Sequence, residues 1–582
     1  MQFLSFYKTL FLVAICLSTS FVFAQKDDKE EAEIDTERLI IVKPYSPSVS
    51  DAFKVKQTPS INDSTERKKK KVTYDIFSFP VASTFTPAKG KAAGVQQKSR
   101  PYLYDNYASL GVGNYLNILA EFYGTLQLNQ NQELGIAFNH NSSQGGIDNA
   151  VLDDKFYNTD LDLSYESQAR GYTWGTDLGV EHLVYNWYGA PNYLPITNAD
   201  YDGIDPQHSY YAISVGANID VEQGIFDKAD FNYRRFGDNF GSGENHVLLT
   251  PKFQFPIGNE NVVNADFSVD YVNGNFDQAL YNDSSLKYSY LNLGILPSIQ
   301  VSEGDFAFDI GAQLVYSMNA ENDENTIYVY PKVTGSYRIA GDYFIAYTGV
   351  EGGLQQNTYY DFVQDNPFVS PTLGIAPTDK QYNVYVGGKG KFTENISYDV
   401  RANYSAEKDK ALFIHNPYQS SLASEGFEYF NSFSTVYDDV KTLGAFGELQ
   451  VAFNDKLQLK ANVELQTYDV ENQEEAWNLP QLSGSFLADY QITEKWSAGA
   501  TIYYMGERKD YFSYTASSLT EDKTVTLDGF VDVNLNVGYQ LNNRLGFFLR
   551  GNNLLEGNYQ RWMGYSVQDI QVMAGATYQF DW

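Results

Sequence analysis

The side chains that most often carry out chemistry are few and scattered in this sequence. Its five histidines, at positions 140, 182, 208, 246 and 415, show no metal-ligand spacing. No Gly-x-Ser-x-Gly or P-loop pattern is present, and the only cysteine is Cys16. The sequence therefore offers no catalytic and no cofactor-binding residue, and we expect a protein that is not an enzyme.

One loop has oxygen-bearing side chains at a spacing that suits a metal ion. They are Asn198, Asp200, Asp202 and Asp205. With Gly203 at the sixth position, they match the first half of an EF-hand loop, but Ser209 replaces the closing glutamate. Calcium binding in this loop is therefore a hypothesis, with a solvated acidic loop as the alternative. No other cofactor is expected.

The N-terminus indicates export. Lys8 precedes a short apolar run, and Val22-Phe23-Ala24 has the small residues at alternate positions that signal peptidase accepts. Residues 1–24 are therefore a predicted signal peptide, with the mature chain starting at Gln25. Cys16 lies within this peptide, so the mature chain has no thiol for a disulfide or a zinc site.

The composition favours a membrane β-barrel. No later stretch has the ~20 apolar residues of a membrane helix. Yet aromatic residues make up 16% of the chain, with 47 Tyr and 38 Phe, and the mean hydropathy is -0.38. A barrel explains both, because aromatic girdles mark its interfaces and only alternate strand residues face lipid. A string of soluble β-sandwiches is the alternative. The net charge of -32 argues against a nucleic-acid partner.

Period-two alternation places carboxylates on one face of many segments. In residues 305–319, for example, Phe308, Ile310 and Leu314 oppose Asp309 and Gln313. A dry core could not hold such carboxylates unpaired, whereas a water-filled lumen can. We therefore predict a group of lumenal carboxylates, namely Asp162, Asp266, Asp270, Asp309 and Asp532.

The links between these segments alternate between two classes. Tight turns such as Glu303-Gly304 and Asn454-Asp455 alternate with long links such as 416–432 and 515–528. Short periplasmic turns and long outer loops are typical of bacterial outer-membrane barrels. We count about 22 segments in residues 101–582 and expect an antiparallel barrel in outer-membrane lipid, with both termini in the periplasm. Trp187, Trp477 and Trp562 lie near long links and are expected at the lipid interface.

Residues 25–100 show little strand periodicity and include the basic run 67–71. They form a periplasmic or lumenal segment, either a solvated linker or a reduced plug. The basic run is either a solvated stretch or a contact for anionic head groups or a periplasmic partner.

The last 32 residues resemble the C-terminus of TonB-dependent receptors. They contain Asn553-Leu554-Leu555-Glu556, Tyr559, a Gly-containing loop, and a closing strand that ends Tyr578-Gln579-Phe580-Asp581-Trp582. Gln568-Asp569 stands where the family often has an arginine. The resemblance covers residues 104–582 and implies transport of a solute through a wide barrel. It also implies that the barrel assembly machinery reads the last strand, with Phe580 and Trp582 as the closing signal.

The N-terminal segment departs from that family. Residues 25–100 leave no room for a full plug and contain no plug motif, so the plug is missing or reduced. Residues 36–42 resemble a TonB box, which would pair with TonB by strand addition. The main expectation is therefore a transporter in a Gram-negative outer membrane. The alternative is a scaffold barrel that anchors periplasmic or surface partners. Either way, loops, residues 25–100 or a partner must occlude so wide a lumen.

Overall fold

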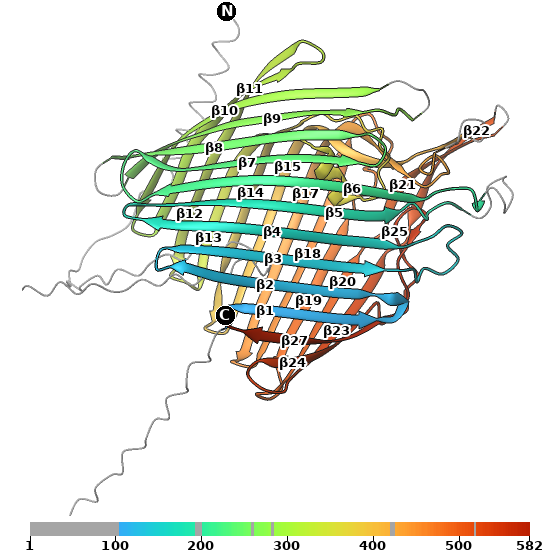
Figure 1. The fold of residues 1–582 in the computed structure, drawn as a ribbon. Helices are drawn as coiled ribbons and strands as arrows, with labels where there is room; N and C mark the ends of the chain where they lie inside the picture. Colours follow the sequence, from blue (N-terminus) through green and yellow to red (C-terminus); the bar gives the residue numbers. More distant parts are fainter. Residues whose placement is uncertain (1–103, 192–200, 258–260, 281–284, 420–424, 517–518) are drawn as a thin grey trace, which may run out of the picture. The chain divides into compact units, whose positions relative to one another are not determined.

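The computed structural model describes residues 104–191, 201–257, 261–280, 285–419, 425–516 and 519–582 (Figure 1). The predicted signal peptide, the basic run and the segment that resembles a TonB box lie outside the described residues, so those interpretations stay predictions. Within the described residues, 22 antiparallel strands form one sheet.

The barrel strands follow one another around the wall in chain order. The first eight are β1 (Asn106–Gly113), β2 (Ile118–Asn129), β3 (Gln132–Ser143), β4 (Phe156–Ala169), β5 (Tyr172–Asn186), β6 (Gln207–Val221), β7 (Phe226–Asp238) and β8 (Gly243–Ile257). The next seven are β9 (Asn261–Phe276), β10 (Leu286–Glu303), β11 (Phe306–Asn319), β12 (Glu324–Ala340), β13 (Phe344–Gln355), β14 (Thr378–Thr393) and β15 (Ile396–His415). The last seven are β17 (Phe433–Asn454), β18 (Leu457–Val470), β19 (Leu482–Gln491), β20 (Trp496–Met505), β23 (Phe530–Gln540), β24 (Leu545–Asn552) and β27 (Gln571–Phe580).

The smaller elements all lie in links between barrel strands. A 3-10 turn (Asn114–Leu116) joins β1 to β2, and helix α3 (Tyr359–Asp365) lies between β13 and β14. Strands β21 (Arg508–Ala516) and β22 (Leu519–Leu527) form a hairpin with which β16 (Tyr418–Gln419) pairs, and β25 (Gln560–Trp562) pairs with β26 (Tyr565–Ser566). The link 515–528, expected to be a loop, is therefore largely a hairpin arm.

The first and last strands close the barrel. Leu110 on β1 lies opposite Ala120 of β2 on one side and opposite Ala576 of β27 on the other. Closure pairs every strand on both edges, so no edge is left to aggregate. The prediction of about 22 antiparallel strands is confirmed. Because the number is even, Asn106 and Phe580 lie opposite each other at the same rim.

Tight turns and long links lie at opposite rims, as predicted. Gly171, Gly304 and Gly341 at the tight turns have φ of +88°, +58° and +54°. Short hairpin turns need such left-handed backbone, and glycine adopts it without steric penalty. The rim with the tight turns also holds both ends of the sheet, which makes it the periplasmic rim.

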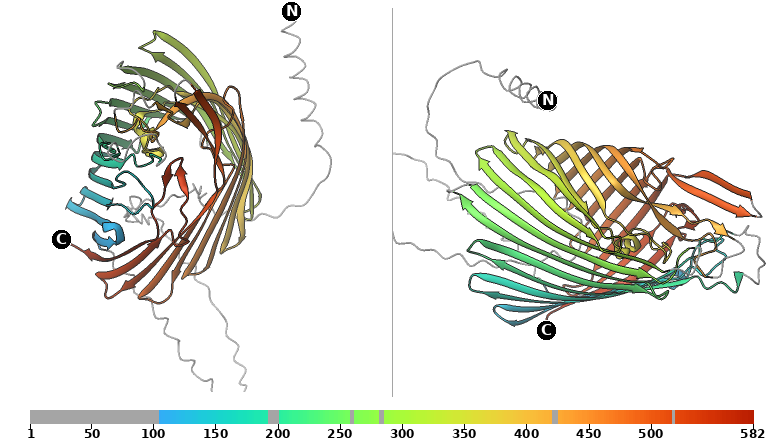
Figure 2. Two further views of the ribbon diagram at one scale, coloured as in Figure 1. Left: turned by 90° about the vertical axis from the view of Figure 1, so that its right-hand side faces the viewer. Right: turned by 90° about the horizontal axis from the view of Figure 1, so that it is seen from above.

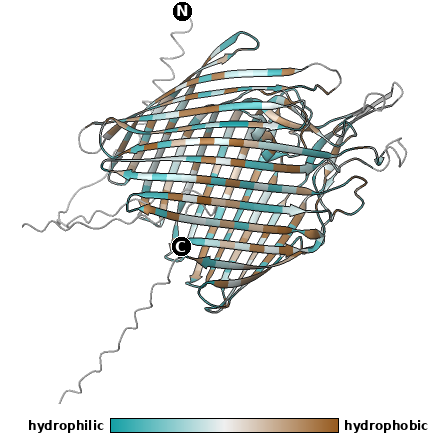
Figure 3. Cartoon of the chain, viewed as in Figure 1, coloured by the Kyte–Doolittle hydropathy of each residue, from teal (hydrophilic) through white to brown (hydrophobic). Residues whose placement is uncertain are grey.

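Hydrophobic and hydrophilic residues alternate along the barrel strands in Figure 3, and many of the large apolar side chains on these strands are exposed. On β11, Phe308, Ile310 and Leu314 are 42%, 54% and 45% exposed, and on β12 Ile327 and Val329 are 66% and 69% exposed. A band of this kind is stable only against lipid. Among the described residues, no helix is long and apolar enough to cross a bilayer.

The buried core lies under the outer loops. We call it the outer core; its largest fully buried side chains are Trp187, Tyr210, Phe236, Phe276, Tyr359, Phe427, Phe433 and Tyr565. Burying each such ring stabilises the fold by roughly 1.5–3 kcal/mol. Trp187 and Trp562 belong to this core, and Trp477 is buried in a neighbouring cluster. Their expected place at the lipid interface was wrong, because the loops fold back and enclose these rings.

Candidate functional site: the lumen and its outer closure

The five carboxylates predicted to be lumenal lie on barrel strands, where they alternate with apolar residues. Asp162 lies between the outward Leu161 and Leu163 on β4, and Asp309 lies between Phe308 and Ile310 on β11. Asp266 and Asp270 on β9 and Asp532 on β23 alternate with apolar residues in the same way.

Two of the five carboxylates have basic neighbours. An oxygen of Asp270 lies 2.8 Å from Nε2 of His246, and one of Asp266 lies 3.6 Å from Nζ of Lys252. Both partners come from β8, the strand beside β9. The ammonium group of Lys252 therefore weakens the negative potential around Asp266.

A second group of carboxylates lies on strands β2 to β5. We call this the acidic wall; its members are Glu121, Asp160, Asp162, Asp177 and Glu181. The strand register sets Glu121 beside Asn139, and Asn139 beside Asp160. Among the ion pairs of the described residues, none includes a member of this wall. Sequence reasoning found only Asp162, although continuing the alternation along 160–166 would have added Asp160.

A long link folds inward near the outer end of the barrel. We call residues 356–377 the inner loop; they join β13 to β14 and contain α3. Figure 2 shows α3, in yellow, inside the ring of strands. Thr358 begins the helix, accepting a hydrogen bond from the backbone N–H of Asp361 at 3.0 Å. Val363, Val369 and Leu373 are each at most 1% exposed, so the loop is packed rather than solvated.

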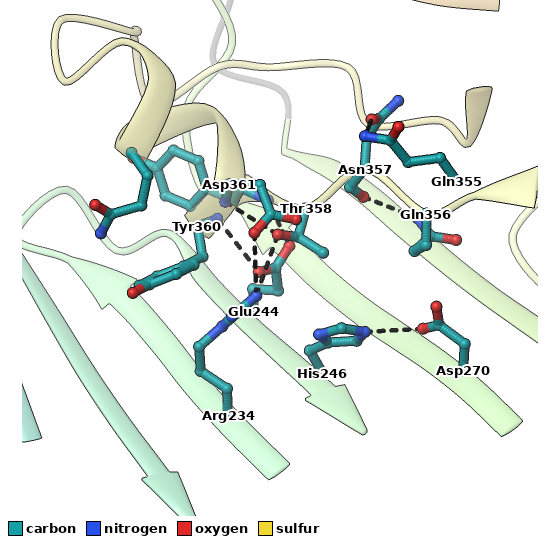
Figure 4. A network of polar contacts seen from close by, with 12 residues as sticks. Arg234, Glu244, His246, Asp270, Gln355, Gln356, Asn357, Thr358, Tyr360 and Asp361 are labelled. Carbon is teal, nitrogen blue, oxygen red and sulfur yellow. Dashed lines mark hydrogen bonds and ion pairs between the residues drawn. The ribbon is translucent and has the colours of Figure 1, made fainter. Parts of the chain in front are cut away.

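Glu244, at the start of β8, holds the first turn of α3 to the wall (Figure 4). Its fully buried carboxylate accepts the backbone N–H of Tyr359 at 2.6 Å and of Tyr360 at 3.4 Å. It also accepts the hydroxyl of Tyr288 at 2.7 Å. Burial raises the pKa of Glu244, which these hydrogen bonds only partly offset.

Two residues of β7 complete this attachment. The guanidinium of Arg234 lies 3.8 Å from the ring centre of Tyr360 and donates to Oγ1 of Thr358 at 3.2 Å. Asp238 accepts the hydroxyl of Tyr359 at 2.8 Å, and its carboxylate lies 3.3 Å from His208. Burial alone would raise the pKa of Asp238, but hydrogen bonds from His208 and Tyr359 outweigh it and hold that pKa below its usual value.

The far part of the inner loop pairs with β17 through backbone groups. The N–H of Ser370 donates to the carbonyl of Phe433 at 2.8 Å, and the N–H of Phe433 donates to the carbonyl of Phe368 at 3.1 Å. The hydroxyl of Tyr437 donates to the carbonyl of Gly374 and accepts the N–H of Ala376, both at 2.9 Å.

The β21–β22 hairpin has a buried polar contact at its base. Asp510 is 0% exposed and accepts the backbone N–H of Tyr511 at 2.8 Å and of His415 at 3.3 Å. Burial raises the pKa of Asp510 to about 7 and lowers that of His415 to about 3. Both ring nitrogens of His415 lack a hydrogen-bond partner, so its neutral form is favoured. Arg508 donates to the backbone carbonyl of Gln560 at 2.8 Å, which ties the hairpin to β25.

The calcium hypothesis is only partly covered by the structure. Asn198 and Asp200 lie outside the described residues, and Asp205 accepts the backbone N–H of Gln207 at 3.1 Å. In the part of the chain that the structure describes, no group of three or more His, Cys, Asp or Glu side chains could hold a metal ion. Calcium binding therefore stays a prediction.

Of the comparisons with known proteins, the one with solved structures found matches. No family model and no curated protein matches the sequence. Among solved structures, the ferric enterobactin receptor of Pseudomonas aeruginosa has a TM-score of 0.60 at 12% identity, over 82% of this chain and 80% of that one. The ferric-catecholate import receptor Fiu of E. coli K12 has a TM-score of 0.59 at 11% identity, over 83% of this chain and 82% of that one. The fold is that of a TonB-dependent receptor barrel.

A third match is similar over the same region. The iron transporter FrpB of Neisseria meningitidis has a TM-score of 0.61 at 10% identity, with 82% of each chain covered. The resemblance inferred from the C-terminal motif is thus confirmed at the level of the fold. The apolar outer band is that of a barrel that spans a lipid bilayer with its strands.

Proposed function

We propose that this receptor barrel passes a solute across the outer membrane through its lumen, and that the inner loop closes the outer end of that path. The observation that supports this most is the inward fold of residues 356–377, which are held by Arg234, Asp238 and Glu244 on the lumenal face. A barrel of 22 strands is wide and would leak without such a closure.

Three further parts of the proposal concern the solute, the energy source and assembly. The solute is larger than those that porins pass, because narrower barrels already serve small molecules. Residues 36–42 couple the barrel to TonB, and the assembly machinery recognises β27. The solved structures with this fold include proteins named as iron and copper transporters, which is consistent with transport.

Conductance in planar bilayers tests the proposal on the full mature chain. Replacing residues 357–376 with a short Gly-Ser linker should open the lumen and raise single-channel conductance in potassium chloride well above that of the unchanged chain. A matched variant replaces residues 144–155, the outer loop after β3, and should leave conductance low. Equal conductance of all three proteins would refute the inner loop as the closure.

A scaffold remains the second candidate because the outer loops share one buried core. Such a core makes the outer surface a rigid platform for partners. If the Gly-Ser variant folds, as judged by heat-dependent gel mobility, but does not conduct, the scaffold function is favoured over transport.

A further inference from the structure

One pair of neighbouring strands in the wall, β1 and β27, is joined by no link at either rim. Every other pair follows in chain order, so the turn or loop between its two strands limits how far they can slide along each other. We call the contact between β1 and β27 the seam. Its register has to come from contacts around the two strands, and that register sets the stagger of the closed ring.

The facing residues of the seam do little to fix that register. Gly111 lies opposite Gly575, so neither strand offers a side chain at this point. A slide of one residue would turn every side chain to the wrong face, but a slide of two residues keeps the faces. Two alternatives therefore compete with the observed register. One brings Ser109 opposite Gly575, and the other brings Gly113 there.

Phe548 on β24 opposes the first of these alternatives. Its ring covers both glycines, since a Cβ atom added at Gly575 would lie 2.2 Å from its Cζ atom and one added at Gly111 would lie 2.9 Å from it. A Cβ atom at Gly111 would also lie 2.9 Å from Sδ of Met573. Ser109 in that place would press against both groups. The second alternative brings a glycine there, which fits, so packing blocks a slide in one direction only.

Gln568, in the link before β27, distinguishes the observed register from the second alternative. Its side-chain amide donates to Oγ of Ser143 at 2.6 Å and to the backbone carbonyl of Gly145. Gln568 is 8% exposed and Ser143 is 0% exposed, so water competes little for these bonds. Both partners lie at the outer end of β3, which is joined to β1 through β2.

The link between β3 and β4 is also tied to the end of β1 itself. The backbone N–H of Gln144 donates to the carbonyl of Tyr115, just after β1, at 2.9 Å. The same link accepts the N–H of Asp569 on the carbonyl of Gly146 at 3.1 Å. It therefore holds one strand of the seam on each side. A slide of two residues would move Gln568 by about 7 Å from its partners and break its bonds to them.

We propose that Gln568 is a register clasp, whose amide selects the observed pairing of β1 with β27 when the barrel closes. Asn114 also bonds across the seam, donating to the carbonyl of Ile570 at 2.7 Å and accepting the N–H of Val572 at 2.9 Å. Backbone groups recur every second residue along a strand, so Asn114 finds equivalent partners after a slide of two and does not select the register. The clasp acts in assembly and does not depend on transport.

Disulfide cross-linking can identify the register, because the mature chain has no cysteine of its own. Directly opposite residues have Cβ atoms about 5 Å apart, which a disulfide can bridge with a small adjustment, whereas the Cα atoms of diagonal neighbours are about 7–8 Å apart, which it cannot. Ser109→Cys with Thr577→Cys is the in-register pair. Ser109→Cys with Gln579→Cys is the permitted-slide pair, and Tyr107→Cys with Thr577→Cys is the blocked-slide pair, which the ring of Phe548 opposes.

The assay uses the full mature chain, refolded from urea into detergent micelles and then oxidised. A disulfide between the first and last strands closes the polypeptide into a ring, which migrates faster than the linear chain on a boiled, non-reducing gel. Unboiled samples show the folded fraction. Without further changes, the in-register pair should cross-link and the two slide pairs should give almost no ring.

Variants of the clasp should release the slide in one direction. Gln568→Ala should raise the cross-linked fraction of the permitted-slide pair about fivefold or more, because two hydrogen bonds that favour the observed register are lost. Gln568→Glu keeps the size of the side chain, but its carboxylate cannot donate, so it should act in the same direction. The blocked-slide pair should stay low in both. Asn114→Ala is the matched control, since it also removes two hydrogen bonds at this end of the seam, and it should raise neither slide pair.

Three results would overturn the clasp. The first is an unchanged permitted-slide pair in both Gln568 variants. The second is an equal rise in Asn114→Ala, because any loosening of the seam would then be enough. The third is failure of both Gln568 variants to refold while Asn114→Ala folds, because a barrel that has slipped by two residues still closes its sheet.

Discussion

Removing one hydroxyl from α3 should loosen the inner loop by a measurable amount. In Tyr359→Phe, Asp238 loses a hydrogen bond of 2.8 Å, while its contact with His208 at 3.3 Å stays. The ring keeps its packing, since its centre lies 4.9 Å from that of Phe276 and 5.1 Å from that of Phe236. The change therefore isolates one hydrogen bond to a buried carboxylate.

The expected size follows from the charge on the acceptor. A hydrogen bond to a charged group contributes about 1.5–3 kcal/mol net. Each 1.4 kcal/mol changes an equilibrium constant about tenfold, so the open population should rise roughly 10- to 150-fold. A cysteine placed at the buried position Val363 on α3 reacts with a water-soluble maleimide only when the loop opens. In this Val363→Cys protein, the rate of maleimide labelling should therefore rise by that factor at a fixed maleimide concentration. A rise of less than about threefold, or an equal rise at Leu373→Cys, would refute the assignment of Asp238 as an anchor of α3.

Four further predictions follow from the barrel, its lumen and its loops. Unboiled samples should migrate differently from boiled ones on gels and resist protease outside the loops, because a closed barrel has no free edge; identical migration with complete proteolysis would contradict closure. Deleting Phe580–Trp582 removes the end of β27 that pairs with β1, and should strongly lower the amount of protein in outer-membrane fractions; normal amounts would contradict its role as closing signal. Deleting residues 26–100 and opening the lumen should give a cation-sided reversal potential in a salt gradient, because no ion pair among the described residues includes a member of the acidic wall; an anion-sided value would refute an acidic path. Asp510, with a pKa raised from 3.8 to about 7 by burial, favours docking of the β21–β22 hairpin most below about pH 4 and loses this contribution as pH rises from about 4 to 7, whereas neutral His415 loses its contribution as pH falls from about 6.5 to 3. Asp510→Asn should therefore slow hydrogen exchange in β21 at pH 8 relative to the unchanged chain, and faster exchange would contradict the burial cost.

The wall of the barrel could be predicted from sequence because its signals are local. The alternation in residues 305–319 predicted β11 almost to the residue, and Gly304 and Gly341 marked the tight turns before β11 and after β12. Each of these features depends on residues within one strand or one turn. The lumenal face follows from the same alternation, which is why Asp309 was assigned to it.

The attachment of α3 to Arg234, Asp238 and Glu244 could not be predicted in this way, because it depends on contacts between distant segments. Glu244 and Tyr359 are 115 positions apart, and nothing near Glu244 shows that a loop returns to meet it. The same reason explains the errors at Trp187 and Trp562, whose burial requires several loops at once. The β22 arm was missed although Thr524 to Leu527 alternate, because a long link with polar residues reads as an irregular loop.

The outer core also bears on how the protein matures. Its residues come from strands and links as far apart as Leu183 near the start of the barrel and Tyr565 just before the last strand. Phe368 stacks on Tyr565 with ring centres 3.6 Å apart, so this contact forms only after the link before β27 has been made. A chain that stops early, or that inserts with one link misplaced, therefore leaves aromatic side chains exposed at its outer end. Completion of the wall and burial of that aromatic surface therefore depend on each other.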